Sequence, residues 1–289
     1  MPDDDRSPIA GTEVHYLSSR HVGDEFKIFI GHCGYPPRDQ EGEPRPVLYV
    51  GDGNGIFAGA VEVVRFMQLS AHLPPLLVVG IGYRMSVLAE TVAVRTRDFT
   101  PTADPLFSRL FPAQVMMGGA PRFLAFIRDE LQPWVRGRFH SAGDAAFFGH
   151  SMGGLFATYA LLSDASPFQR YAIASPSLWW DDDMMFDVEE RYASAHDDLP
   201  AKVFVSIGEH EDHDGRQREA SRMPPDERAN ANARYIDMVA DTRRLVAALR
   251  GRNYPGLQIG DVVLPGEFHI TSPHLSLSRA LRYLYDAPD

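Results

Sequence analysis

The chain has 289 residues, of which 44% are hydrophobic and 23% charged, and one large globular domain can hold this length. The 28 basic and 39 acidic residues leave a formal net charge of −11, which argues against binding to nucleic acid or to an anionic membrane. Cys33 is the single cysteine, so an intrachain disulfide is excluded. No cysteine and histidine spacing resembles a zinc site, and we therefore expect no metal.

The first eleven residues are polar and acidic, and we expect a flexible N-terminus there. They lack the basic segment followed by an apolar segment that is typical of a secretory signal peptide. No stretch of the chain is both long and apolar enough to span a bilayer. These features predict a cytoplasmic protein with no membrane partner, although a longer precursor could have lost its leader.

Predicted strands and helices alternate along the chain. Alternating apolar side chains at residues 25–30 predict a strand that is half-exposed at the edge of a sheet. Residues 36–46, rich in proline, glycine and charge, predict a surface loop. The other predicted strands are 47–50, 76–81, 145–148, 171–174, 202–207 and 257–264, and the predicted helices are 56–69, 121–135, 152–162, 230–249 and 274–284.

This alternation implies βαβ units, and thus an α/β fold with a mostly parallel central sheet flanked by helices. We see no internal repeat and no linker, and we predict a single domain over residues 1–289. Two segments, 98–119 and 181–199, interrupt the rhythm of strands and helices. Loops of this kind usually build the site of an α/β protein, so we expect small loop or helix insertions over the site.

The strongest local signal is Gly149-His150-Ser151-Met152-Gly153, between a predicted buried strand and a predicted helix. It matches the G-x-S-x-G elbow of the α/β-hydrolase fold, in which a strained turn lifts the serine hydroxyl clear of the sheet. The amide of Met152 would then point at the developing oxyanion, near the positive end of a helix. The bare pattern occurs often by chance, but its position between a strand and a helix favours catalysis by Ser151.

A serine nucleophile needs a histidine base, which an acid holds in the right tautomer. In the α/β-hydrolase fold the order along the chain is nucleophile, acid, histidine. His269 follows the last predicted strand and is the candidate base, and His274 is the alternative. We interpret three further histidines on polar loops as surface residues: His196, His210 and His213.

Four carboxylates compete for the role of the acid. In this fold the acid stands just past the seventh strand, here residues 202–207, and the usual placement three residues after the strand's final glycine selects Glu211. A shift of one residue in the strand end would favour Asp212 instead. Glu209 lies too close to the strand to turn back easily, and Asp214 begins a polar segment. A further interpretation is that all four are solvated loop charges.

These residues together resemble the putative-esterase family of the α/β-hydrolase superfamily, which includes esterase D and the enterochelin and salmochelin esterases. The resemblance covers roughly residues 47–285. It rests on the segments VLYVGDGNGIF (47–57), LLVVGIGYR (76–84), RTRDFTP (95–101), GGAPRFLAFIRDELQPW (118–134), FGHSMGG (148–154), SPSLWW (175–180), VSIGEHE (205–211) and GEFH (266–269).

The resemblance implies roles by position. Ser151 matches the nucleophile, His269 the base, and Glu211 a position where glutamate is common. Residues 52–54 match the loop that supplies the second oxyanion amide, for which Asn54 is favoured over Gly53. Arg97 and Asp98 match a recurring segment that braces the loop or touches substrate.

Substrate contacts are less well defined. Trp180 follows a predicted strand and is either a pocket wall or core packing, and Gly53 and His150 are further candidate substrate-binding residues. The run of aspartates at 181–183 could be mistaken for a metal site, but we interpret it as a solvated turn and the start of a helix.

We therefore predict a serine carboxylic-ester hydrolase that acts through a covalent acyl-enzyme without a cofactor. Residues 106–117 offer mainly Phe, Leu and Met, with Arg109 as the only basic residue, which favours a hydrophobic acyl or aryl ester. A siderophore trilactone is the alternative substrate, and acyl transfer or thioester cleavage could use the same machinery. A non-catalytic binding protein is disfavoured because the nucleophile and the base are both present. For the oligomeric state, the expectation is a homodimer.

Overall fold

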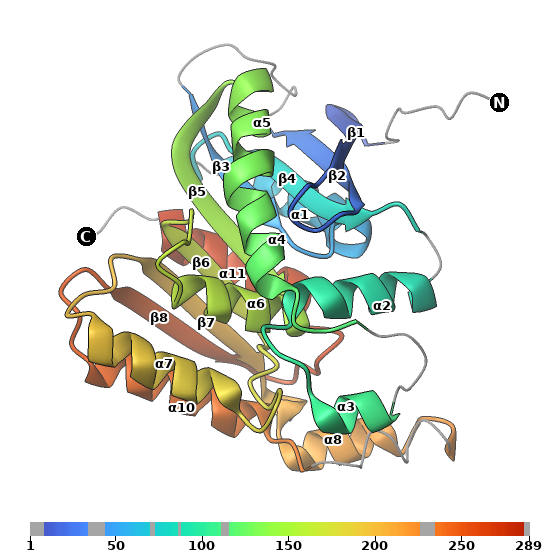
Figure 1. Ribbon diagram of the computed structural model, residues 1–289, viewed down its shortest axis with the longest axis vertical. Coiled ribbons are helices and arrows are strands. Elements are labelled where there is room, and N and C mark those ends of the chain that lie inside the picture. The colour runs from blue at the N-terminus through green and yellow to red at the C-terminus, as the bar shows by residue number, and fades with distance from the viewer. Residues whose placement is uncertain are drawn as a thin grey trace.

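The computed structural model describes residues 9–33, 44–69, 73–85, 88–110, 116–225 and 235–285. Its strands are β1 (Thr12–Ser18), β2 (Glu25–His32), β3 (Arg45–Val50), β4 (Leu77–Tyr83), β5 (Ser141–His150), β6 (Arg170–Ala174), β7 (Lys202–Gly208) and β8 (Gln258–Leu264). They form one sheet in the order β1-β2-β4-β3-β5-β6-β7-β8 (Figure 1). β1 and β2 are antiparallel to their neighbours, and all other pairs are parallel. The predicted α/β fold with a mostly parallel sheet is confirmed.

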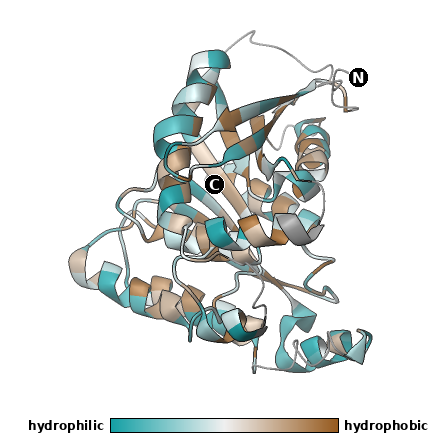
Figure 2. Ribbon diagram, turned by 45° about the vertical axis from the view of Figure 1, so that its right-hand side comes forward, coloured by the Kyte–Doolittle hydropathy of each residue, from teal (hydrophilic) through white to brown (hydrophobic). Residues whose placement is uncertain are grey.

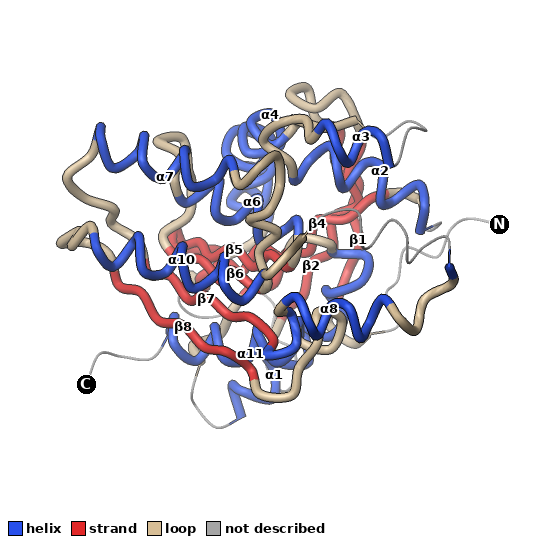
Figure 3. The backbone as a smooth tube through the Cα atoms, turned by 90° about the horizontal axis from the view of Figure 1, so that it is seen from below, coloured by secondary structure: helices blue, strands red, loops and turns tan. Residues whose placement is uncertain are grey.

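The helices are α1 (Gly53–Leu69), α2 (Leu88–Phe99), α3 (Pro105–Leu110), α4 (Ala120–Phe126), α5 (Gln132–Arg138), α6 (Met152–Leu161), α7 (Met184–Ala195), α8 (His213–Ala220), α10 (Met238–Gly251) and α11 (Pro273–Tyr285). A π-helical turn, η1 (Ile127–Leu131), joins α4 to α5, and a 3-10 turn, η2 (Glu209–Glu211), follows β7. Figure 3 shows α1 and α11 on one side of the sheet and α4, α6 and α7 on the other.

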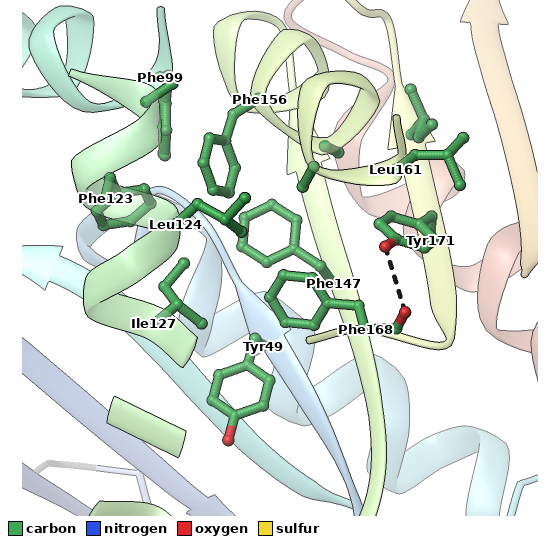
Figure 4. Close-up of a cluster of buried hydrophobic side chains, with 14 of the residues drawn as sticks. Tyr49, Phe99, Phe123, Leu124, Ile127, Phe147, Phe156, Leu161, Phe168 and Tyr171 are labelled. Atoms are coloured by element: carbon green, nitrogen blue, oxygen red, sulfur yellow. Dashed lines mark hydrogen bonds between the residues drawn. The ribbon is translucent and has the colours of Figure 1, made fainter. Parts of the chain in front are cut away.

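The central strands are buried on both faces because helices cover both sides of a parallel sheet. Successive side chains of a strand point to opposite faces, so Phe147 of β5 enters one core and Phe148 enters the other. Aromatic rings from α4, α6 and neighbouring strands fill the first core around Phe147 (Figure 4). Apolar residues follow the strands and the inner sides of the helices, and polar residues face outward (Figure 2).

The position of β2 corrects one prediction. β2 lies between β1 and β4, and β1, which was not predicted, forms the edge of the sheet. Phe26 and Ile28 of β2 are fully buried, and Phe26 stacks on Phe126 of α4. Alternation along a strand reveals a buried face, but it says nothing about whether both edges of the strand are paired.

The two segments that interrupt the predicted rhythm hold helices as well as loops. The segment at 98–119 contains α3, and the segment at 181–199 contains α7. The helix predicted at 230–249 is described as α10 from Met238, while residues 226–234 lie outside the described residues. Most of the predicted loop at 36–46 and most of the predicted flexible N-terminus also lie outside them. In the described part of the chain, no helix is both long and apolar enough to cross a membrane.

Candidate active site

Ser151 lies on the sharp turn between β5 and α6. Its backbone angles are φ 62° and ψ −119°, a strained conformation for a residue with a side chain. The glycines around it allow the turn, because a Cβ atom at Gly149 would collide with the carbonyl oxygen of Gly153, and one at Gly154 would lie 2.7 Å from the carbonyl oxygen of Ala174. The turn holds the Ser151 hydroxyl at the carboxyl edge of the sheet, as the elbow geometry requires.

A chain of hydrogen bonds links Ser151 to a histidine and a carboxylate. The Oγ of Ser151 lies 3.0 Å from Nε2 of His269, and Nδ1 of His269 lies 2.6 Å from Oε2 of Glu211. His269 follows β8, and Glu211 ends the 3-10 turn after β7. The structure therefore brings together the three residues that the sequence pointed to as nucleophile, base and acid.

The Glu211 carboxylate is fully buried and is bound by several donors. Its Oε1 accepts hydrogen bonds from the amide of Gly208 at 2.8 Å and from the hydroxyl of Ser175 at 2.6 Å. Ser175 also lies 3.3 Å from the hydroxyl of Ser272, which donates to the carbonyl of His269 at 3.2 Å. These hydrogen bonds satisfy the buried carboxylate oxygens and hold the Glu211 side chain in place.

The competing carboxylates have other partners. Oδ1 of Asp212 accepts from the amide of Gly215 at 2.7 Å and so caps α8. Oε2 of Glu209 accepts from the amide of Gly266 at 2.8 Å. Asp214 lies in the first turn of α8. Of the four carboxylates, it is Glu211 whose side chain reaches the imidazole of His269.

The other histidines also have partners of their own. The imidazole of His274 packs against Gly59 on α1, where a Cβ atom would collide with it. His196 stacks on Tyr192, and its Nε2 lies 2.8 Å from the carboxylate of Asp164. The other two histidines that we interpreted as surface residues also pack against aromatic rings: His210 against Phe268, and His213 against Tyr235.

Two helices begin at the carboxyl ends of the neighbouring parallel strands β3 and β5. Met152 opens α6, and Asn54 lies in the first turn of α1. Amides in a first turn have no acceptor within their own helix, and the helix dipole makes this end positive. The Asn54 side chain pins its loop to β4, since Nδ2 donates to the carbonyl of Tyr83 at 2.9 Å and Oδ1 accepts from the Tyr83 amide at 2.7 Å.

Gly53, a candidate substrate-binding residue, has a packing role. A Cβ atom there would lie 2.9 Å from backbone atoms of Gly80 and Ile81 in β4, so a side chain does not fit. This close approach of backbone to backbone explains the glycine without any contact to a substrate.

The ring of His150 packs against that of His269, the candidate base. The His150 side chain is buried, and its ring centroid is 4.6 Å from that of His269. Burial lowers the pKa of His150 well below its ordinary value, and the neighbouring His269 and Arg95 lower this pKa further. His150 is therefore neutral at physiological pH. His150 therefore contacts the base directly. A contact between His150 and a substrate stays a prediction.

Trp180 is fully buried, and its Nε1 donates to the carbonyl of Thr102 at 3.1 Å. Its ring packs against Phe107, with 5.1 Å between the centroids. The structure thus supports core packing, the second of the two interpretations, and argues against Trp180 as a pocket wall. Trp179 is partly exposed and lines a hollow of about 460 Å³ with Tyr235 and several aspartates.

The aspartates at 181–183 form a turn before α7. All three have positive φ angles, and Asp183 stands at the N-cap position of α7. The amide of Asp181 donates to Asp104 at 3.0 Å. Across the described ranges, no group of three or more histidine, cysteine, aspartate and glutamate side chains could hold a metal ion.

Three residues near the site were not singled out as site residues from the sequence. The hydroxyl of Ser177 lies 3.4 Å from that of Ser151, Ser175 binds Glu211, and Arg95 contacts both Asp52 and the carbonyl of His150. Both serines stand in the SPSLWW segment and Arg95 in the RTRDFTP segment, so the family resemblance was the available signal. In contrast, Arg97 forms ion pairs with Asp98 and Asp24, which supports its interpretation as a brace.

Comparisons with known proteins show which family the chain belongs to. Residues 19–245 match the family described as "Putative esterase". Ferri-bacillibactin esterase BesA of Bacillus subtilis (strain 168) is 31% identical over 287 residues, covering 95% of this chain and 90% of the relative. The siderophore triacetylfusarinine C esterase of Aspergillus fumigatus is 29% identical, covering 96% of this chain and 94% of the relative. The crystal structure of the BES protein from Bacillus cereus has a TM-score of 0.75 at 26% identity, with 99% of both chains covered.

The fold and the site define an ester hydrolase of the serine type, built on an α/β-hydrolase sheet. More particularly, the chain belongs to the putative-esterase family, since the family match spans most of its length. The predicted family membership and the predicted esterase activity are both confirmed.

Proposed function

We propose that this enzyme hydrolyses carboxylic esters through a covalent acyl-enzyme, with Ser151 as nucleophile, His269 as base and Glu211 as acid. The observation that carries the proposal is the continuous chain of hydrogen bonds from the Ser151 hydroxyl through His269 to the buried Glu211 carboxylate. The amides of Met152 and Asn54 are proposed as the oxyanion donors.

In the first half of the reaction, Oγ of Ser151 attacks the ester carbonyl carbon while Nε2 of His269 takes the hydroxyl proton. The negative charge of Glu211 stabilises the imidazolium that forms, and the two amides bind the oxyanion. The carbon–oxygen bond to the leaving group then breaks, and the leaving alcohol takes the proton from His269. In the second half, water attacks the acyl carbon and gives a proton to His269. The bond between the acyl carbon and Oγ of Ser151 then breaks, the carboxylic acid is released, and Oγ takes the proton back from His269.

For the substrate, we propose a siderophore ester. Two relatives that span at least 95% of this chain are named as esterases of ferri-bacillibactin and of triacetylfusarinine C. Their names favour the siderophore alternative over the hydrophobic ester that the sequence favoured.

A simple hydrophobic ester is the second candidate, and exposed apolar side chains favour it. Ile270, the neighbour of His269, is 76% exposed, and Met116 is 57% exposed. An apolar group beside the base, such as Ile270, would suit an acyl or aryl chain, and Met116 belongs to the mainly apolar segment at 106–117. Acyl transfer and thioester cleavage remain chemical variants of the same acyl-enzyme. The cytoplasmic location, the lack of a nucleic-acid partner and the homodimer stay predictions.

A fluorophosphonate probe tests the chemistry, and a substrate panel tests the class. The wild type should label and Ser151→Ala should not. Failure of the wild type to label, together with no hydrolysis of aryl esters or trilactones, would contradict the proposal. A ferric trilactone siderophore compared with p-nitrophenyl esters decides the substrate: a much higher kcat/KM on the trilactone supports the siderophore, and the reverse result supports the hydrophobic ester.

A further inference from the structure

One arginine on α2 contacts both of the loops that carry the proposed oxyanion amides. Nε of Arg95 donates to Oδ1 of Asp52 at 2.6 Å, and its Nη2 donates to the carbonyl of His150 at 3.2 Å. Asp52 stands two residues before Asn54, and His150 two residues before Met152. The guanidinium therefore joins equivalent points of two loops that are distant in sequence.

Other residues on the same side of α2 also reach these loops. The hydroxyl of Thr96 lies 3.8 Å from the sulfur of Met152. The ring of Phe99 would lie 3.2 Å from a Cβ atom at Gly51 and 3.6 Å from one at Gly153, so it fits against both glycines. Phe99 is itself held by aromatic contacts on α4 and α6 (Figure 4). α2 is thus a rigid support that touches both loops at several points.

The Asp52 backbone needs such support. Asp52 has a φ of 54°, a left-handed conformation that costs free energy for a residue with a side chain. The side chains of Asp52 and Arg95 are each 18% exposed, so water screens their ion pair little. Burial alone would lower the pKa of Arg95, but the charge and hydrogen bond of Asp52 outweigh it and raise this pKa. Arg95 therefore stays charged.

We propose that Arg95 is a positioning residue that fixes the separation of the two oxyanion loops through the Asp52 carboxylate and the His150 carbonyl. The inference rests on the proposed oxyanion amides of Met152 and Asn54. Oxyanion donors must lie about 2.7–3.1 Å from the developing charge, and losing one donor lowers kcat by about 100-fold to 1,000-fold in other hydrolases. Arg95 sets this spacing without touching the reacting atoms.

The test compares Arg95→Met with Arg97→Met. Both variants remove a guanidinium that forms ion pairs from the same helix, but the partners of Arg97 are Asp98 and Asp24, which lie outside the oxyanion loops. Arg95→Met should lower kcat on a p-nitrophenyl ester by about 10-fold to 100-fold and leave KM within about threefold, because a misplaced oxyanion donor weakens the transition state selectively. Affinity for a trifluoromethyl ketone, which mimics the tetrahedral intermediate, should fall by a similar factor. Arg97→Met should lower Tm but keep kcat and ketone affinity within about threefold of wild type.

Arg95→Lys and Asp52→Asn keep the test decisive if Arg95→Met does not fold. A lysine at position 95 can reach Asp52, but it lacks the planar guanidinium that binds Asp52 and the His150 carbonyl together. The kcat of Arg95→Lys should therefore lie between those of the wild type and Arg95→Met. Asp52→Asn should lower kcat and ketone affinity together.

The inference is overturned if these variants lower Tm while ketone affinity stays at the wild-type value, or if Arg97→Met lowers kcat as much as Arg95→Met. A wild type that neither labels with fluorophosphonate nor hydrolyses esters overturns the proposed function, and the inference with it.

Discussion

The nucleophile elbow, residues 149–154, is shaped mainly by neighbours in sequence, whereas the acid arm, residues 208–211 and 266–272, is assembled from distant parts of the chain. At the elbow, a Cβ atom at Gly149 would collide with Gly153, four residues away. In the acid arm, the bond from His269 to Glu211 joins residues 58 apart, and Ser272 of this arm contacts Ser175, which lies 97 residues away outside it. A local steric requirement leaves a sequence motif, whereas the residues of the acid arm are marked only by their order in the chain and by their positions after strands.

The acid arm is held by reciprocal contacts between two loops. The amide of His210 donates to the carbonyl of Glu267 at 2.9 Å, and the amide of Gly266 donates to the side chain of Glu209 at 2.8 Å. These bonds fix the loop after β7 against the loop after β8. Glu211 and His269 can therefore meet only when both loops are folded, and the arm should respond to any change that weakens this pairing.

Replacing the acid should have the largest effect on activity. Glu211→Gln keeps the size of the side chain but removes the charge that stabilises the imidazolium, and kcat should fall by about 1,000-fold to 10,000-fold. Asp212→Asn is the matched control, because Asp212 caps α8 and does not contact His269. It should retain kcat within about threefold and lose at most about 1 kcal/mol of stability. The reverse result in p-nitrophenyl ester assays would move the acid to Asp212, and two active variants would indicate a serine–histidine dyad.

The elbow should respond to a change in shape alone. Gly149→Ala adds one methyl group where the carbonyl of Gly153 already lies, and it should lower the free energy of unfolding by about 3 kcal/mol and abolish labelling by fluorophosphonate. Gly143→Ala, on the same strand, is the control, since a Cβ atom there meets nothing within 4 Å. Urea unfolding of both variants measures the difference. Equal stabilities would refute the steric account of the elbow.

The hydroxyl network around the acid should have an intermediate effect. Ser175→Ala removes the 2.6 Å donor to Glu211, and kcat should fall by about 10-fold because the buried carboxylate loses part of its hydrogen bonding. Ser276→Ala is the control. Ser276 is equally buried, but its hydroxyl has no hydrogen-bond partner among the residues that the structure describes. A Ser175→Ala enzyme as active as Ser276→Ala would show that Glu211 needs no help from Ser175.

The same contrast explains what could be predicted from the sequence. The elbow at Ser151 and the histidine after the last strand follow from a motif and an order, and Glu211 followed from counting residues after a strand. The fully buried position of Trp180 did not follow, because a tryptophan after a strand suits a pocket wall and a core equally well. β1 was missed because its residues are mostly half-buried, so little apolar alternation marks it. The role of Arg95 depends on contacts with two loops that only the folded chain brings together.

Asp241 provides the prediction with the smallest expected effect. It tests whether a buried carboxylate lowers the free energy of unfolding when few hydrogen-bond donors surround it. Asp241 lies in the first turn of α10, which packs against the loop after β7. Burial raises its pKa to about 6, and the charges of Asp183 and Asp237 contribute to this rise while Arg244 opposes it. Glu211, by comparison, is bound by an amide, a hydroxyl and an imidazole.

The pKa of Asp241 in the folded protein lies above its value near 4 in the unfolded chain. Ionisation of Asp241 therefore lowers the free energy of unfolding progressively between about pH 4 and pH 6, and this loss is constant at higher pH. Asp241→Asn should therefore stabilise the protein by about 1 kcal/mol at pH 8, after allowance for the solvent that screens this half-buried side chain. The gain should shrink as the pH falls towards 4. Urea unfolding at pH 8 and pH 5 measures this gain in stability. Asp187→Asn is the control, because Asp187 is exposed and lies in the first turn of α7, and its stability should change little at either pH. A gain that is equal at both pH values, or a loss at pH 8, would mean that the Asp241 carboxylate is as well accommodated as that of Glu211.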